Sequence, residues 1–124
     1  LSGSALDNSL AAGAGNDTVN GRDGNDILDG GDGIDTVLFS GAAGVSVDLG
    51  QTLSQATGEG SDVITGFENI TSGAGNDALT GNEGDNIIDA GAGDDTVLGQ
   101  GGADTLLAAA GDDSMNGGDG IDTA

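Results

Sequence analysis

Acidic side chains recur every nine residues in this chain, at one fixed place in a glycine-rich phrase. The clearest copy is Gly30–Leu38, which has the form G-G-x-G-x-D-x-U-x, where U is a large apolar residue. Aspartate holds the sixth position in eight copies: Asp17, Asp26, Asp35, Asp77, Asp95, Asp104, Asp113 and Asp122. A carboxylate beside flexible backbone carbonyls offers the oxygen ligands that a hard cation such as Ca²⁺ prefers. The phrase therefore predicts cation binding.

The copies begin at residues 3, 12, 21 and 30, and again at 72, 81, 90, 99, 108 and 117. The copy at 3–11 is degenerate, with Leu6 in place of glycine and Asn8 in place of aspartate, and we expect it to be an edge or capping repeat. An acidic, glycine-rich chain with few aromatic residues could be disordered. Against that alternative, apolar residues keep the same period, at Leu10, Val19, Leu28, Val37, Leu79, Ile88, Val97, Leu106 and Met115.

Charge and composition exclude several classes of function. The formal net charge is −21, Arg22 is the one cationic side chain, and the chain has no Lys, His or Cys. A P-loop needs its lysine, and a nucleic-acid partner needs a basic face. Catalytic triads and zinc sites need His or Cys. No apolar run is long enough for a membrane span, and the lack of a signal peptide fits an internal fragment or another route of export.

The spacing predicts a fold. Six glycine-rich residues can make a tight turn, and the remaining x-U-x triplet is long enough for a very short strand whose apolar side chain points to one side. Two nonapeptides then close one coil, and successive coils stack about 4.8 Å apart. We therefore predict an all-β protein, a parallel β-roll: a right-handed β-solenoid with two nonapeptides per coil and two short-stranded parallel sheets.

Stacked coils bring sixth-position aspartates together. The expected pairs are Asp17 with Asp35, Asp77 with Asp95, Asp95 with Asp113, and Asp104 with Asp122. Carboxylates this close repel one another, and Ca²⁺ relieves the repulsion because it takes six to eight oxygen ligands. Mg²⁺ fits less well, and an EF-hand is excluded because no glutamate has the acidic spacing it requires. A solvated acidic face is the alternative without a ligand.

We interpret residues 1–124 as a single segment, with a first repeat block at 3–38, an insert at 39–71 and a second block at 72–124. In the insert, alternating Val45, Val47 and Leu49 predict a strand, and 51–61 reads as a loop. Residues 63–71 return to the nine-residue frame, with Ile70 in the apolar slot and Glu68 in place of aspartate. We expect longer strands here, packed by the two aromatic residues, Phe39 and Phe67.

The two blocks share one phrase. Residues Gly117–Thr123 repeat Gly30–Thr36 letter for letter, 87 residues later. This identity predicts that the chain is one period, with flanks, of a larger array in which the second block is truncated.

The nonapeptide resembles the RTX (repeats-in-toxin) hemolysin-type calcium-binding repeat, over nearly the whole chain except residues 39–62. The resemblance implies that each of several Ca²⁺ ions lies between two loops that are two repeats apart. The earlier loop gives its second and fourth carbonyls and its aspartate, and the later loop gives its first and third carbonyls and its aspartate.

Carried onto this chain, the resemblance implies four sites. The first is Gly13, Gly15, Asp17, Gly30, Asp32 and Asp35. The second is Gly73, Gly75, Asp77, Ala90, Ala92 and Asp95. The third is Gly91, Gly93, Asp95, Ala108, Ala110 and Asp113, and its later loop has alanine in its first two positions. The fourth is Gln100, Gly102, Asp104, Gly117, Asp119 and Asp122. Two weaker sites would pair Asn8 with Asp26 and Asn86 with Asp104, through an uncharged amide oxygen.

The function these observations favour is a calcium-binding structural module that folds outside the cell, in a secreted or cell-surface protein of a Gram-negative bacterium, such as an adhesin or S-layer-like array. The alternative is the non-catalytic C-terminal module of a secreted metalloprotease, lipase or alginate epimerase, and a toxin's receptor-binding region is a third class. The chain carries no catalytic constellation, and we expect no enzymatic activity. Expected partners are calcium ions and neighbouring repeats, with end-to-end stacking of rolls as a further association.

Overall fold

The computed structural model describes residues 1–41 and 43–124, and these residues form β-strands with no helix. Accordingly, the described chain has no helix that is long and apolar enough to cross a membrane. The strands are β1 (Ser9–Ala14), β2 (Thr18–Val19), β3 (Ile27–Asp32), β4 (Thr36–Leu38), β5 (Ser46–Asp48), β6 (Gln55–Ala56), β7 (Ser61–Thr65), β8 (Asn69–Thr71), β9 (Ala78–Thr80), β10 (Ile87–Asp89), β11 (Thr96–Gly101), β12 (Thr105–Leu107) and β13 (Ser114–Asp119).

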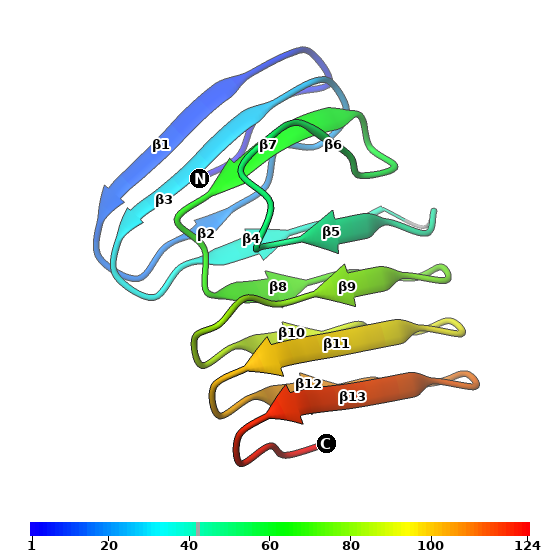
Figure 1. Ribbon diagram of the computed structural model, residues 1–124. Helices are drawn as coiled ribbons and strands as arrows, with labels where there is room; N and C mark the ends of the chain where they lie inside the picture. Colours follow the sequence, from blue (N-terminus) through cyan, green and yellow to red (C-terminus); the bar gives the residue numbers. More distant parts are fainter. Residues whose placement is uncertain (42) are drawn as a thin grey trace.

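The strands alternate between two faces of a flattened roll (Figure 1). One face is a five-stranded parallel sheet in the order β12-β10-β8-β4-β2. Within each repeat block, paired residues are 18 positions apart, as in Ser9 with Ile27 and Thr96 with Ser114. Because 18 residues are two nonapeptides, this register confirms the predicted all-β parallel roll with two repeats per coil.

The opposite face differs from the single sheet that we expected. It consists of two sheets, β1-β3-β7-β6 and β13-β11-β9-β5, which meet at the insert. The insert places both β5 and β7 on this face, while β4 pairs directly with β8 on the other, with Thr36 opposite Asn69. One face therefore gains a strand that has no counterpart across the roll, and Figure 1 shows β1, β3 and β7 tilted relative to β5, β9, β11 and β13.

The sequence predicted the strand around Val47 correctly but missed a hairpin. β5 spans Ser46–Asp48, within the alternating stretch. The stretch 51–61, expected to be a loop, contains β6, which pairs antiparallel with β7. A turn in which the Thr57 N–H donates to the Gly60 carbonyl (3.0 Å) closes this hairpin. The polar composition of the stretch concealed the strand, because β6 packs at an edge where one residue, Gln55, is buried.

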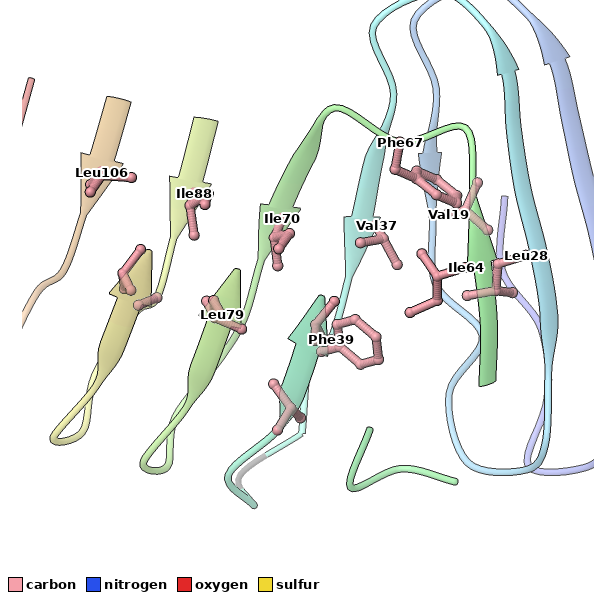
Figure 2. Close-up of a cluster of buried hydrophobic side chains, with 14 residues drawn as sticks. Val19, Leu28, Val37, Phe39, Ile64, Phe67, Ile70, Leu79, Ile88 and Leu106 are labelled. Atoms are coloured by element: carbon pink, nitrogen blue, oxygen red, sulfur yellow. The ribbon is translucent and has the colours of Figure 1, made fainter. Parts of the chain in front are cut away.

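The apolar slots of the repeats form the core (Figure 2). Val19, Leu28, Val37, Ile70, Leu79, Ile88, Val97 and Leu106 are each at most 1% exposed. The rings of Phe39 and Phe67 belong to the same core cluster and are buried, as expected for residues that pack the insert. Met115 is an exception at 39% exposed, because its strand β13 has no further coil packed against it.

Candidate metal centres

Loops stack along both edges of the roll, and a hydrogen-bond ladder joins their sixth positions. On one edge the Asp17 N–H donates to Asp35 Oδ1 (2.7 Å), and the Asp104 N–H donates to Asp122 Oδ1 (3.0 Å). Between these pairs, the Asp35 N–H donates to Glu68 Oε2 (2.8 Å). Glu68 therefore takes the sixth position at the three-residue turn 66–68, as the sequence predicted.

The other edge carries the same ladder with one interruption. The Asp77 N–H donates to Asp95 Oδ1 (2.9 Å), and the Asp95 N–H donates to Asp113 Oδ1 (3.0 Å). All four expected aspartate pairs are thus brought together. The interruption lies in the insert, where Val45 holds the sixth position and gives only its N–H, to Asp77 Oδ1 (2.8 Å).

One carboxylate oxygen has no partner in five of the six buried aspartates, and the exception is Asp62, whose Oδ2 accepts from the Thr57 hydroxyl. Asp26, Asp35, Asp77, Asp95 and Asp104 are at most 3% exposed, and their Oδ2 atoms are buried without a hydrogen bond. An unpaired buried charge of this kind costs several kcal/mol, roughly, unless a cation or proton compensates it. Burial raises the pKa of Asp95, the N–H of Asp77 opposes that rise, and the like charges of Asp77, Asp113 and Asp94 add to it.

Backbone carbonyls point into the space between stacked loops. In loop 30–35, a Cβ at Gly31 would collide with the carbonyl oxygen of Gly13, and a Cβ at Gly33 would collide with that of Gly15. Both glycines have φ in the left-handed region, at 98° and 147°, which other residues rarely adopt. The second and fourth carbonyls of the earlier loop therefore face the later loop, as the expected ligand set requires.

The carbonyls of the later loop point back in the opposite direction. A Cβ at Gly99 would collide with the carbonyl oxygen of Gly117, one coil later. The third-position carbonyls of Asp32, Ala92, Ala110 and Asp119 each accept the fourth-position N–H of the preceding loop, at 2.7–3.0 Å. A carbonyl oxygen has a second lone pair, so these atoms keep an acceptor site for a cation.

This donor set fits Ca²⁺. Each gap between stacked aspartate loops brings together two carboxylates and carbonyls from both loops, all hard oxygen ligands. In the described residues no group of three or more acidic side chains is placed to hold a metal. An ion between two loops would accordingly take most of its oxygens from the backbone, which is the chemistry that glycine-rich turns supply.

Comparison with known proteins agrees with this geometry. The family model of the RTX calcium-binding nonapeptide repeat matches the chain in four copies, at residues 2–37, 57–97, 71–106 and 93–124. The chain belongs to this RTX family. RTX nonapeptide repeats bind Ca²⁺, and the chain is a calcium-binding structural module of a generally non-catalytic type. A search of curated proteins found no match.

The RTX match and the structure also reveal a repeat that we did not predict. Residues Thr57–Thr65 follow the nonapeptide, with Gly58 and Gly60 in place and Asp62 at the sixth position. The Asp26 N–H donates to Asp62 Oδ1 (2.8 Å), so Asp62 continues the ladder. Extending the nine-residue period of the first block predicts this repeat, because residue 57 lies 27 positions, or three nonapeptides, after residue 30.

The same hidden repeat brings further acidic side chains together. Glu59 Oε1 accepts the N–H of Gly41 (3.2 Å), and its other oxygen is buried without a partner. Burial raises the pKa of Glu59, and so do the charges of Asp23, Asp62 and Asp26. Burial likewise raises the pKa of Asp26, where the N–H of Asn8 opposes the rise.

Proposed function

We propose that Ca²⁺ ions bind between the stacked aspartate loops and that their binding drives the folding of this chain. The observation that carries the proposal is the set of five buried, unpartnered Oδ2 atoms on sixth-position aspartates. With a net charge of −21, the metal-free roll is self-repelling. Binding energy at such sites becomes folding energy because the unfolded chain does not hold the ligands together.

The proposed ligands are those expected from the repeats. In the first site, for example, Asp17 and Asp35 contribute carboxylates, Gly13 and Gly15 contribute carbonyls from the earlier loop, and loop 30–35 contributes carbonyls from the later one. Their arrangement supports this proposal: the Asp17 N–H donates to the Asp35 carboxylate, the Gly13 and Gly15 carbonyls point at the later loop, and the Asp32 carbonyl points back at Gly15. The same relation holds for the second, third and fourth sites.

We further propose that the module works outside the cell, where Ca²⁺ is abundant, as one segment of a longer array in a secreted or surface protein. The RTX family is typically extracellular in Gram-negative bacteria. The repetition of Gly30–Thr36 at Gly117–Thr123 favours an array over a single module attached to an enzyme. In this function the roll is a spacer whose stiffness depends on external calcium.

Isothermal titration calorimetry tests calcium binding. The chain in chelator-treated buffer is titrated with Ca²⁺ and, separately, with Mg²⁺. We expect several Ca²⁺ ions per chain and a large negative heat capacity change, because folding buries apolar surface. Equal binding of Mg²⁺, or Ca²⁺ binding without a heat capacity change, would contradict the proposal.

A further inference from the structure

Two loops of the roll have asparagine, not aspartate, at the sixth position, and their side chains are satisfied without a cation. Asn86 Oδ1 accepts the N–H of Asn82, the second residue of its own loop (2.8 Å). Asn8 Oδ1 accepts the N–H of Ser4 in the same way (2.6 Å). The corresponding Oδ2 atoms of the five buried aspartates have no donor.

The amide oxygen stands where the unpartnered aspartate oxygen stands. A Cβ at the first residue of a loop would collide with Asn86 Oδ1 in loop 81–86, and with Asp104 Oδ2 in loop 99–104. The two side chains thus aim one oxygen at the same point of the loop. The difference is that in loop 81–86 a backbone N–H reaches this oxygen.

The side-chain amide nitrogens of loop 81–86 also donate hydrogen bonds. Asn86 Nδ2 donates to the carbonyl of Glu68 (2.6 Å) and to Asn82 Oδ1 (3.2 Å), and Asn82 Nδ2 donates to the carbonyl of Phe67 (3.3 Å). The carbonyls of Phe67 and Glu68 therefore receive side-chain N–H donors from loop 81–86, and both are satisfied without a cation. Asn86 is 1% exposed, so these bonds are shielded from water.

Backbone conformation at the second position does not separate the two classes of loop. Arg22 and Gln100 are the two non-glycine residues with positive φ among those described, and both hold the second position of an aspartate loop. The second residues of the asparagine loops, Ser4 and Asn82, do not have positive φ. The aspartate loops 72–77 and 108–113 also lack it at this position. The feature that separates the two classes is therefore which side chain accepts the second N–H: in the asparagine loops it is that of the sixth residue.

We infer that the sixth residue decides whether a loop needs calcium: aspartate leaves an oxygen for the ion, whereas the amides of Asn86 and Asn8 replace the ion with hydrogen bonds. Amides can do this because they carry both donors and an acceptor and no charge. The contact between turn 66–68 and loop 81–86 then forms without calcium. The inference rests on the proposed calcium sites, and it replaces the expectation that Asn8 and Asn86 are weak calcium ligands.

Counting bound ions tests the inference. Native mass spectrometry of the calcium-loaded chain is compared for the wild type, Asn86→Asp, Asn86→Ala and the control Asn76→Asp, which adds the same charge at an exposed fifth position. We expect Asn86→Asp to bind one more ion than the wild type and Asn76→Asp to bind the same number. Asn86→Ala keeps the wild-type number, since Asn86 is not a ligand.

The opposite results would overturn it. Loss of one bound ion in Asn86→Ala would show that the Asn86 oxygen is a ligand. An unchanged number of bound ions in Asn86→Asp would show that the sixth residue does not decide whether the loop binds calcium. Should Asn86→Ala fail to fold, the Asn86 side-chain NH₂ signal of the wild type decides: we expect slow hydrogen exchange, and fast exchange contradicts the inference. A wild-type chain that binds no Ca²⁺ would instead contradict the proposed function itself.

Discussion

The backbone N–H of Asp77 lies 2.9 Å from Oδ1 of Asp95, while Oδ2 of Asp95 is buried and has no partner. One oxygen of this carboxylate thus belongs to the fold, and the other is left for a ligand. The same division recurs at Asp26, Asp35, Asp77 and Asp104. It explains how one side chain can connect coils and bind an ion at the same time. It also explains why each of these buried carboxylates destabilises the metal-free roll.

Substitution of Asp95 by asparagine is expected to have opposite effects with and without calcium. In Ca²⁺, loss of a charged ligand shared by the second and third sites should lower the free energy of unfolding by about 1–3 kcal/mol. In chelator, removal of a buried charge that is repelled by Asp77 and Asp113 should raise it. Chemical denaturation in Ca²⁺ measures the first effect, and the β signal in the circular dichroism spectrum in chelator measures the second.

The matched control is Asp94→Asn, which removes the same charge from the exposed neighbouring position. Its effect in either buffer should be within about 0.5 kcal/mol. A destabilisation by Asp95→Asn of the same sign and size in both buffers would contradict a ligand role for this carboxylate.

Glycine at the fourth position is expected to matter only where the loops approach closely. Gly93 has φ of 141°, and a Cβ there would collide with the Gly75 carbonyl. Gly93→Ala should therefore lower the free energy of unfolding in Ca²⁺ by at least about 2 kcal/mol. Gly84, also a fourth residue, has no positive φ, and its Cβ would meet only the Asn82 side chain at 3.3 Å. A cost for Gly84→Ala equal to that of Gly93→Ala would refute this explanation.

The metal-free roll should become more stable on acidification. The pKa values of Asp26, Glu59 and Asp95 are raised in the folded state, chiefly by burial. Between the ordinary carboxyl pKa of about 4 and these raised values, the native state binds more protons than the unfolded state. The free energy of unfolding in chelator should therefore fall as pH rises through this window, and rise as pH is lowered through it.

Calcium should reverse this dependence. Because protons and Ca²⁺ compete for the same carboxylates, calcium affinity should weaken as pH falls toward 4. Circular dichroism in chelator and in Ca²⁺, at pH values from about 4 to 7, measures both trends. A chelated chain that gains no β structure on mild acidification would show that these carboxylates are not the groups that destabilise it.

Much of the fold could be predicted because the period itself encodes it. A nine-residue repeat with one apolar slot determines both the coil and the 18-residue register, and hence which aspartates meet, as with Asp17 and Asp35. What the repeat could not predict is the face to which an irregular segment adds a strand. The insert puts β5 and β7 on one side, and Phe39 and Phe67 are buried in the core beside them.

The site residues that were missed have equally physical reasons. Asp62 lies in a repeat that is in phase with the first block but begins 15 residues before Ser72, out of phase with the second. The six residues 66–71 absorb the change of phase through a three-residue turn, which Glu68 bridges with its longer side chain. The closure of the Asn86 loop was missed because its amide oxygen was expected to coordinate calcium as a carboxylate does. Its bonds to the N–H of Asn82 and the carbonyl of Glu68 become visible only once the loops are placed against one another.

Calcium-driven folding is the central claim, and far-UV circular dichroism during a Ca²⁺ titration tests it most directly, with Mg²⁺ as the control and chelator to reverse the change. We expect a disordered spectrum in chelator, a cooperative and reversible gain of β signal in Ca²⁺, and little change in Mg²⁺. A chain that is fully folded in chelator at neutral pH, or indifferent to Ca²⁺, would contradict the account.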